Sequence, residues 1–343
     1  MQALILAGGE GTRLRPLTTT VPKPVVPLAN RPFITYMIDW LQRHGFDDVV
    51  MSCGFLADGV RRVLGTGDLN GVTIRYVDEP EPLGTAGAVK LAEPVLGERF
   101  AVLNGDVLTD LDIARLLDFH EQRGAVATLG LYPVADPTSY GVVVTDQGGA
   151  VEAFLEKPAP GTAPTNHVNA GMYVLEHEVL DHIDGGRAVS FEREVFPSLV
   201  GAGLHGIALD GYWMDIGTPD RYLQATRDIL HGTVETPVSP SEDVNGATQP
   251  VLVGSGCEIA PDAALGPDVT LGDACRIAPG AAVHGSSMHA GVTVEEGAIV
   301  RDSIVGSRAR VGSGARLEGE TIVGEDAVVP PGTHLTAGRV PPA

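Results

Sequence analysis

Hydrophobic and polar positions alternate between two kinds of segment over the first 230 residues. Short apolar or β-branched runs predict strands at residues 3–7, 49–53, 73–77 and 101–104. Apolar residues at helical spacing predict helices at residues 33–44, 60–64, 85–92 and 111–123. This alternation is typical of an α/β fold with a Rossmann-like, mainly parallel sheet covered by helices on both faces. Such a sheet binds ligands beyond the carboxyl ends of its strands. Residues 125–175 contain more strand, and we expect them to extend the sheet and carry a second substrate.

The pattern changes after residue 230. Residues 231–250 are rich in Pro, Ser, Thr and Asp, lack periodicity, and predict a linker. From residue 251 an apolar residue recurs every six positions, at Val253, Ile259, Leu265, Leu271, Ile277 and Val283. The register slips around residues 284–288 and near Ser303, then resumes at Val305. A period of six predicts a parallel β-helix of hexapeptide repeats, with three hexads in each coil of about 18 residues and about four coils. We therefore expect a catalytic domain at 1–230, a linker at 231–250 and a β-helix at 251–343.

Charge and composition narrow the partners. The formal net charge is -21, so electrostatic repulsion argues against nucleic acid as a partner. No apolar run approaches the roughly 20 residues of a membrane span, and residues 1–2 lead into a strand without a basic leader. Cys53, Cys257 and Cys275 are too few and scattered for a disulfide scaffold or a zinc site. We expect buried, reduced thiols and a cytoplasmic location.

Lysine is scarce in this chain. There are three lysines and twenty arginines, and two of the three lysines, Lys23 and Lys157, directly precede a proline. A chain that has nearly dispensed with lysine but keeps it in two turns is expected to need a compact ammonium group there. The alternative is chance placement in two turns.

The segment LILAGGEGTRLRPLTTTVPKPVVPL, residues 4–28, contains a glycine-rich turn directly after a predicted strand. It lacks the Lys-Ser or Lys-Thr of a Walker A loop, and Leu14 stands where a dinucleotide fingerprint needs its third glycine. Backbone amides in such a turn can bind phosphate oxygens, while Arg13 clamps them and Lys23 adds a point charge. This combination suits a nucleoside triphosphate whose pyrophosphate is to leave.

These residues resemble a known family. The stretch from Leu6 to Leu14, together with residues 21–24, looks like the signature of the sugar-nucleotide pyrophosphorylases, which join a sugar 1-phosphate to a nucleoside triphosphate. The likeness covers nearly the whole chain and continues, in the family's order, through residues 81–87, 103–106, 154–158, 169–171 and 213–218. The hexapeptide tail resembles the left-handed β-helix that many members carry. Residues 139–143, 168–173 and 192–197 look most like the members that use GTP and mannose 1-phosphate.

The resemblance implies a set of site residues. The catalytic residues are Arg13, Lys23, Asp106, Lys157 and Asp215, with Asp106 and Asp215 as ligands of Mg²⁺. The nucleotide-binding residues are Leu6, Ala7, Gly8, Gly9, Gly11, Thr12, Arg13, Lys23, Glu79, Gly84, Thr85, Asn104 and Gly105. The sugar-phosphate residues are Tyr140, Gly141, Glu156, Lys157, Asn169 and Gly171. A small residue at Gly105 is expected to let ribose and the α-phosphate approach the backbone.

The absence of a glutamine in one segment indicates which nucleotide base the protein binds. Relatives that transfer thymidylyl or uridylyl groups often place a glutamine in the segment where this chain has residues 78–84, with glutamates at 79 and 81. A carboxylate only accepts hydrogen bonds, and guanine offers two adjacent donors, so Glu79 or Glu81 favours guanine.

Other functions stay open. One is a glucose-1-phosphate thymidylyl- or uridylyltransferase, and another is a regulatory subunit that binds sugar nucleotide without catalysis. A third is an acyltransferase in the tail, with His284 or His289 turned outward as a base. We expect the β-helix to form a homo-oligomer.

Overall fold

The chain forms two compact units, in a computed structural model that describes residues 1–65, 67–69, 71–242, 244 and 246–341. The first unit contains Met1–Gly9 and Met37–Trp213, and the second contains Glu10–Tyr36 and Met214–Ala343. The glycine-rich turn therefore divides between them after Gly9. The expected domain boundaries at residues 230 and 251 remain a prediction about which parts fold independently.

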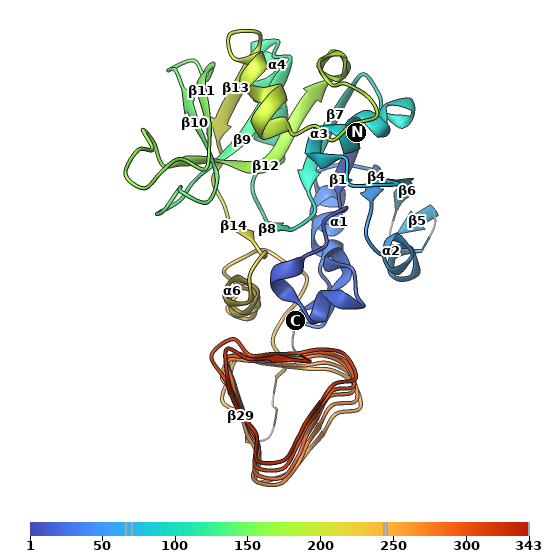
Figure 1. Ribbon diagram of the computed structural model, residues 1–343, viewed down its shortest axis with the longest axis vertical. Helices are drawn as coiled ribbons and strands as arrows, with labels where there is room; N and C mark the ends of the chain where they lie inside the picture. The colour runs from blue at the N-terminus through green and yellow to red at the C-terminus, as the bar shows by residue number, and fades with distance from the viewer. Residues whose placement is uncertain (66, 70, 243, 245, 342–343) are drawn as a thin grey trace. The chain divides into compact units, whose positions relative to one another are not determined.

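A mixed sheet is the centre of the first unit (Figure 1). Its strand order is β11-β10-β12-β7-β1-β4-β6-β5, with β9 pairing both β12 and β13. The four predicted strands are confirmed as β1 (Gln2–Leu6), β4 (Asp48–Cys53), β6 (Val72–Asp78) and β7 (Arg99–Asn104). They run parallel in the order β7-β1-β4-β6, so their carboxyl ends share one edge of the sheet.

The extension predicted for residues 125–175 is also present. Antiparallel pairing joins β12 (His167–Glu176) to β7, β9 (Ala127–Pro133) and β10 (Gly141–Thr145). The remaining strands of this unit are β5 (Gly67–Leu69), β8 (Val107–Thr109), β11 (Val151–Glu156) and β13 (Leu204–Ala208). The strand β14 (Trp213–Asp215) begins with the last residue of this unit.

The predicted helices are confirmed within a few residues. They are α1 (Ile34–Arg43), α2 (Ala57–Leu64), α3 (Gly84–Leu91) and α4 (Ile113–Arg123). Local chemistry sets the ends of α4: the Asp112 side chain accepts a hydrogen bond from the Arg115 amide at 3.1 Å, and Gly124 ends the helix at a φ of 56°. The shorter helices are η4 (Glu93–Val95), η5 (His177–His182), the π-helical turn η6 (Phe191–Val195) and α5 (Phe196–Leu199).

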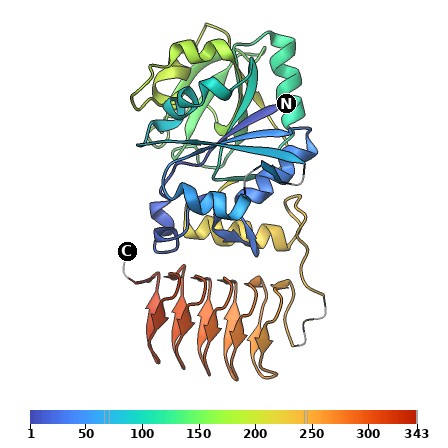
Figure 2. The same ribbon diagram turned by 90° about the vertical axis from the view of Figure 1, so that its right-hand side faces the viewer.

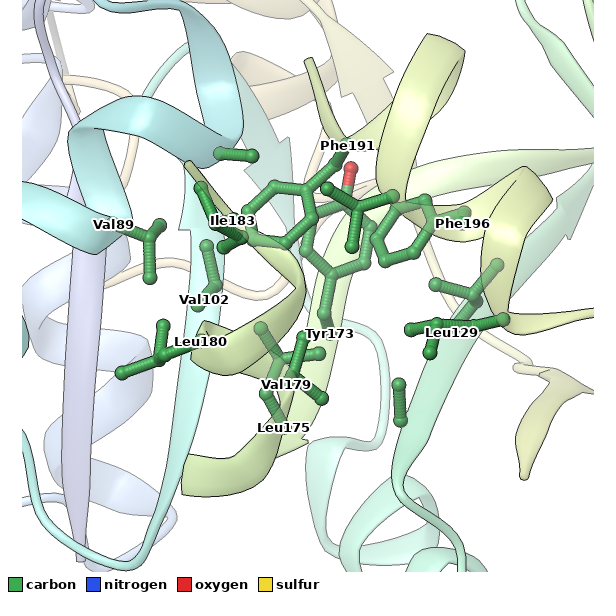
Figure 3. Packing of buried hydrophobic residues seen from close by; sticks show 14 of the residues in the cluster. Val89, Val102, Leu129, Tyr173, Leu175, Val179, Leu180, Ile183, Phe191 and Phe196 are labelled. Carbon is green, nitrogen blue, oxygen red and sulfur yellow. The ribbon is translucent and has the colours of Figure 1, made fainter. Parts of the chain in front are cut away.

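Aromatic rings lie in the core that supports β12 (Figure 3). The rings of Phe191 and Phe196 stack with centroids 5.0 Å apart, and Tyr173 meets Phe196 edge to face at 4.9 Å. All three side chains are fully buried, so the segment around η6 is anchored by apolar burial and by favourable ring geometry.

The predicted β-helix is confirmed in the second unit (Figure 2). Three parallel sheets form its sides, and the coil looks triangular when seen end-on in Figure 1. One sheet contains β15 (Val251–Val253), β18 (Val269–Leu271), β21 (Ser287–Met288), β24 (Ile304–Val305), β27 (Ile322–Val323) and β30 (Arg339–Val340). The second contains β16 (Glu258–Ile259), β19 (Arg276–Ile277), β22 (Thr293–Val294), β25 (Arg310–Val311) and β28 (Val328–Val329). The third contains β17 (Ala264–Leu265), β20 (Ala282–His284), β23 (Ile299–Arg301), β26 (Arg316–Glu318) and β29 (His334–Thr336).

The expectation of about four coils is wrong. In the described part of the chain the three sheets hold six, five and five strands, which corresponds to about five coils. Val251 pairs with Val269, eighteen residues later, but Thr270 pairs with Ser287, only seventeen residues later. Coils shortened by one residue account for both predicted slips in register. The length of residues 251–340 already holds about five coils of about 18 residues, so the expected number was too low.

The hexad positions fill the β-helix core as expected. Leu265, Leu271, Ile277 and Val283 are buried there, and so is Cys275. Cys257 and Cys275 are free thiols that stack on adjacent coils beside the paired residues of β16 and β19, which confirms them as packing residues.

The second unit also contains short turns, a strand pair and a helix. Residues 10–36 form the 3₁₀ turns η1 (Thr12–Leu14), η2 (Leu17–Thr19) and η3 (Lys23–Val25), then the paired strands β2 (Pro27–Leu28) and β3 (Arg31–Pro32). The helix α6 (Pro219–Leu230) also belongs to this unit. Across the residues that the structure describes, no helix has the length and apolar character needed to cross a bilayer.

Candidate functional site

A glutamate lies against the glycine turn at the end of β1. A Cβ added to Gly8 would lie 2.6 Å from Oε1 of Glu79, so only a glycine lets this carboxylate sit there. The hydroxyl of Ser52 donates to Oε1 at 2.9 Å, and the amide of Leu83 lies 3.4 Å from Oε2. Two donors thus fix the carboxylate beside the backbone of the predicted nucleotide loop.

The structure separates the two glutamates that the sequence left open. Glu79 is partly buried beside Gly8, whereas Glu81 is exposed. Ser52 escaped the sequence analysis, although its place near the carboxyl end of β4, next to β1, was a usable signal. Near Gly9 nothing lies within 4 Å of an added Cβ, so that turn stays open on one side.

The end of β7 packs tightly on the end of β1. The Gly105 amide donates to the Leu6 carbonyl at 2.9 Å, and an added Cβ would lie 2.6 Å from that oxygen. The structure thus gives Gly105 a packing role on β1 besides the expected approach of substrate. Gly171, with a φ of 68°, leaves room for the Asn104 side chain, whose Nδ2 would lie 2.5 Å from a Cβ there.

Asn104 holds an unused acceptor. Its Oδ1 atom is buried without a hydrogen-bond partner among the described residues. Buried polar atoms are nearly always paired, so an orphan at the carboxyl end of a parallel strand fits a group that a ligand hydroxyl would satisfy.

Asn169 begins a chain of side-chain hydrogen bonds. Its Nδ2 donates to the Tyr173 hydroxyl at 2.8 Å, and its Oδ1 accepts from the Gly171 amide at 2.9 Å. The Tyr173 hydroxyl donates to Oε1 of Glu192 at 3.4 Å, and Thr85 donates to Oε2 at 2.8 Å. Burial raises the pKa of Tyr173 well above its ordinary value, so the phenol stays protonated.

Two predicted nucleotide residues have structural roles in this network. The Thr85 hydroxyl, besides donating to Glu192, accepts from the Phe191 amide at 2.9 Å. Gly84 has a φ of 70°, and a Cβ there would lie 2.6 Å from the Val189 carbonyl oxygen. Thr85 thus fastens the start of α3 to η6, and Gly84 packs on Val189 in the segment before it. Glu192 is a further member that the sequence analysis missed.

Four of the predicted sugar-phosphate residues, Tyr140, Gly141, Glu156 and Lys157, lie at one end of the β10–β11 pair, whereas Asn169 and Gly171 lie in β12. The Lys157 amide donates to the Tyr140 carbonyl at 3.0 Å, and the backbone of Lys157 is left-handed with a φ of 48°. Its ammonium lies 3.7 Å from Oε1 of Glu156, and its side chain is 59% exposed. Gly141 faces Glu156, because a Cβ there would lie 3.2 Å from Oε2.

An aromatic pair stands beside these residues. The Tyr140 ring meets Trp213 edge to face at 5.4 Å, and the Trp213 indole donates to the Ala170 carbonyl at 2.8 Å. Trp213 was not predicted as a site residue, but it joins Tyr140 to the strand between Asn169 and Gly171.

The cationic end of the glycine turn belongs to the second unit. Gly11 has a φ of 61°, and a Cβ there would lie 3.0 Å from Cβ of Lys23. The Thr18 hydroxyl donates to the Gly11 carbonyl at 2.8 Å. Lys23 is only 7% exposed, whereas Thr12 and Arg13 are exposed. The predicted phosphate-binding residues Gly11 and Lys23 are therefore in direct contact.

Asp215 is held at the start of α6. Its Oδ1 accepts from the Gly217 amide at 2.6 Å, and its Oδ2 from Arg221 at 2.8 Å. A Cβ added to Gly217 would lie 2.5 Å from Nη2 of Arg13 and 2.7 Å from Oδ1 of Asp215, so both groups converge on this glycine. Arg221 escaped the sequence analysis, and its place in the first turn of α6 was the available signal.

The Asp215 carboxylate has the chemistry of a ligand for a magnesium ion that arrives with a nucleotide. Asp106 belongs to the first unit and Asp215 to the second, and the described residues hold no group of three or more metal-ligating side chains. Magnesium is usually bound by one or two carboxylates together with substrate phosphates, not by an all-protein cage. Each Asp215 oxygen carries one hydrogen bond and keeps lone-pair capacity for such an ion.

The outward-facing histidine expected for an acyltransferase is not found at residue 289. His289 is 5% exposed, and its Nε2 atom lies 3.1 Å from the buried Tyr222 hydroxyl. Burial lowers the pKa of His289 to about 4. His284 directs Nδ1 to the Gly266 carbonyl. The His289 ring is thus engaged with α6 and the His284 ring with a neighbouring coil of the β-helix.

Comparison with known families matches almost all of the chain. The profile of the family described as Nucleotidyl transferase matches residues 2–232. The profile described as GMPPB C-terminal domain matches residues 247–343.

Among curated proteins, the chain is 37% identical to the mannose-1-phosphate guanylyltransferase of Mycobacterium tuberculosis over 304 residues, which are 88% of this chain and 83% of that protein. It is 38% identical to mannose-1-phosphate guanylyltransferase 1 of Arabidopsis thaliana over 351 residues, covering all of this chain and 96% of the relative.

Two similar solved structures each match about two thirds of the chain. HddC from Yersinia pseudotuberculosis complexed with GMP-PN superposes with a TM-score of 0.57 at 27% identity, covering 65% of this chain and 97% of that one. A putative glucose-1-phosphate thymidylyltransferase from Bacillus anthracis gives a TM-score of 0.59 at 25% identity, covering 66% of this chain and 94% of that one.

Proposed function

This chain belongs to the nucleotidyl transferase family, and we propose that it transfers a guanylyl group from GTP to mannose 1-phosphate, yielding GDP-mannose and pyrophosphate. The observation that carries the proposal is the likeness to mannose-1-phosphate guanylyltransferase 1 of Arabidopsis thaliana, which extends over all of this chain and 96% of the relative. The match to the Arabidopsis protein covers the whole chain and so includes the β-helix. The match to the putative thymidylyltransferase covers only 66% of the chain.

Glu79 supports guanine as the base. Its carboxylate is fixed beside Gly8 by Ser52 and the Leu83 amide, and each oxygen keeps a free lone pair. The N1–H and 2-amino donors of guanine match two adjacent acceptors, whereas uracil and thymine present a donor flanked by carbonyls. HddC from Yersinia pseudotuberculosis, to which this chain is structurally similar, was solved in complex with GMP-PN, which supports the same choice of base.

The reaction needs positioning and neutralisation of charge more than covalent chemistry by the protein. A phosphate oxygen of mannose 1-phosphate attacks the α-phosphorus of GTP, and pyrophosphate departs in line. Arg13 and Lys23 hold the triphosphate and stabilise the charge that grows on the leaving group, with the Gly8, Gly9 and Gly11 backbone close to the phosphates.

The second substrate is assigned to the strand pair that carries Lys157. Its ammonium takes the phosphate of mannose 1-phosphate, exchanging its 3.7 Å contact with Glu156 for a stronger charge. Glu156 and Asn169 then bind sugar hydroxyls, with Tyr140, Gly141 and Gly171 nearby. Asp106 and Asp215 would hold Mg²⁺, which supplies charge neutralisation at the α-phosphate.

The test is a matrix of five nucleoside triphosphates against mannose, glucose and glucosamine 1-phosphates, with pyrophosphate release as the readout. GTP with mannose 1-phosphate should give the highest kcat/KM. Lys157→Met and Lys23→Met should each lower kcat/KM by roughly 10²-fold, with Lys90→Met as a matched lysine control. Equal turnover of dTTP with glucose 1-phosphate would refute the assignment, and no release with any pair would favour a regulatory subunit.

Two further expectations complete the proposal. The three free thiols suit the reducing cytoplasm. We also propose that copies associate through the β-helix, because Val328 on the terminal strand β28 is apolar and 61% exposed. Mass photometry should show a multiple of 35.7 kDa for the full chain and a smaller species for Val328→Asp. A monomer in both cases would refute association.

A further inference from the structure

The segment that carries Arg13 and Lys23 cannot support itself. Up to the start of α1 at Ile34, the regular structure of the described residues 10–36 is limited to three 3₁₀ turns of three residues and one two-residue strand pair. Such turns have poor hydrogen-bond geometry and occur in short pieces, so their conformation depends on what they pack against. In this protein the segment belongs to the same compact unit as α6 and the β-helix.

Direct contacts tie this segment to the β-helix. The Asn30 side chain donates to the Leu271 carbonyl in β18 at 2.7 Å, and the Thr20 hydroxyl donates to Oε2 of Glu325 at 2.9 Å. The Pro16 ring lies against Gly324, where an added Cβ would meet it at 3.2 Å. These contacts reach from residue 271 to residue 325, and so they cross several coils.

A buried tyrosine on α6 connects the segment to the same face of the β-helix. The Tyr222 hydroxyl donates to the Pro27 carbonyl and lies 3.1 Å from Nε2 of His289 and 3.3 Å from the Ser287 hydroxyl. Ser287 in turn accepts from Thr270 at 2.9 Å. Tyr222 is fully buried, and His289 and Ser287 are 5% and 2% exposed.

Donors and acceptors match in one arrangement. A carbonyl only accepts, so the tyrosine proton is directed to Pro27, and the tyrosine oxygen is left as an acceptor. His289 must then donate through Nε2–H. A buried donor or acceptor that loses its hydrogen-bond partner costs more stability than the hydrogen bond contributes. Removing one of these groups therefore disturbs the hydrogen bonds of the others.

The junction lies close to the phosphate-binding groups. Pro27 follows Lys23 by four residues, and Lys23 itself packs on Gly11. The neighbour of Tyr222 on α6 is Arg221, which bonds Oδ2 of Asp215 at 2.8 Å. One helix therefore fixes Asp215 through one residue and the Lys23 segment through the next.

We propose that Tyr222 and His289 are positioning residues for the triphosphate end of the substrate, and that the β-helix acts through them as the platform for the segment bearing Arg13 and Lys23. This inference rests on the proposed function only in assigning that segment to the pyrophosphate moiety. It gives the tail a task within each chain, in addition to any role in assembly.

The experiment measures pyrophosphate binding in the presence of Mg²⁺, by calorimetry on the full-length protein. Tyr222→Phe keeps the ring and removes the hydroxyl, and His289→Leu removes the donor. Each should weaken pyrophosphate binding and raise KM for GTP by about fivefold to tenfold, the equivalent of one buried hydrogen bond. The KM for mannose 1-phosphate should stay within twofold. His289→Gln retains an N–H donor and should restore most of the affinity.

A matched control separates positioning from stability. Thr321 is buried in the β-helix, where its hydroxyl lies 2.7 Å from the Glu318 carbonyl and 3.4 Å from the Leu335 carbonyl and accepts from the Gly338 amide at 3.1 Å. Thr321→Val should therefore lower Tm without changing pyrophosphate affinity. Hydrogen exchange in residues 21–33 should accelerate in Tyr222→Phe and not in Thr321→Val.

The inference is overturned if Tyr222→Phe lowers Tm like the control while pyrophosphate affinity holds. It is also overturned if affinities for pyrophosphate and mannose 1-phosphate fall together. If Tyr222→Phe fails to fold, the pyrophosphate affinities of His289→Gln and His289→Leu are compared instead. A higher affinity in His289→Gln supports the inference, and equal affinities overturn it. Pyrophosphate binding is independent of base and sugar, so this result stands even if the wild-type protein proves to use other substrates.

Discussion

Replacing Gly105 with alanine tests how the end of β7 positions Asp106. A Cβ at this position would lie 2.6 Å from the Leu6 carbonyl oxygen and 3.1 Å from Cγ2 of Ile5. Both neighbours belong to β1, which is paired on both sides and buried. Ordinary van der Waals contact begins near 3.4 Å, so β7 must retreat by several tenths of an ångström.

Two costs determine the magnitude. Overpacking a buried site typically costs about 1–3 kcal/mol. The Gly105 amide bond to Leu6, 2.9 Å long, must stretch with the strand, and a buried hydrogen bond contributes about 0.5–1.5 kcal/mol. We expect Gly105→Ala to lower the free energy of unfolding by about 2–4 kcal/mol. Because Asp106 is the next residue, kcat should fall by roughly 10²-fold, as for other small displacements of catalytic groups.

The assay combines urea unfolding with the Mg²⁺ dependence of pyrophosphate release. Gly185→Ala is the matched control, because nothing lies within 4 Å of a Cβ there and its φ is ordinary. The control should stay within about 0.5 kcal/mol of the wild-type free energy of unfolding. A Gly105→Ala protein of wild-type stability and activity would falsify the packing of β7 on β1 described here.

Three further predictions concern Glu79, His289 and Gly84. Glu79→Gln should lower kcat/KM for GTP by about 10–100-fold, whereas Glu81→Gln should leave it unchanged; equal effects in parallel steady-state assays would contradict the role of Glu79. Burial lowers the pKa of His289 from 6.5 to about 4, so the unfolded state binds more protons between those values and stability falls as pH drops through that window. Between pH 7 and pH 5 the protonation of His289 in the unfolded state lowers the free energy of unfolding by roughly 2 kcal/mol. Denaturant titrations should show a correspondingly smaller loss of unfolding free energy in His289→Gln. If the wild type and this variant lose stability equally over that range, the contribution of His289 is excluded. Gly84→Ala should cost about 2–4 kcal/mol because φ is 70° and a Cβ would meet the Val189 carbonyl. Gly45→Ala, at a φ of 79° in open space after α1, should cost only the backbone strain of about 1 kcal/mol; equal melting curves for the two variants would contradict the steric contribution at Gly84.

The sequence by itself determined the elements and their order. Strand and helix positions followed from apolar periodicity, because each element must bury one face or one stripe wherever it finally packs. The hexad repeat indicated the β-helix for the same reason, since every coil places its apolar side chains in one shared core. The number of coils was wrong because the length of the repeat region sets it, and residues 251–340 hold about five coils of about 18 residues. The one-residue shortening between Thr270 and Ser287 is a separate feature that a strict period of six does not reveal.

Tertiary structure decided which distant residues meet. Glu79 was distinguished from Glu81 by Ser52, twenty-seven residues earlier in the chain, and His289 was covered by Tyr222, sixty-seven residues before it. No local pattern encodes such contacts, because they depend on how whole elements pack together. Glycine at 105 and the placement of the Lys23 segment with the β-helix were decided in the same way. Chemistry-bearing residues are thus read from the sequence, whereas the groups that hold them in place emerge only when the chain is packed.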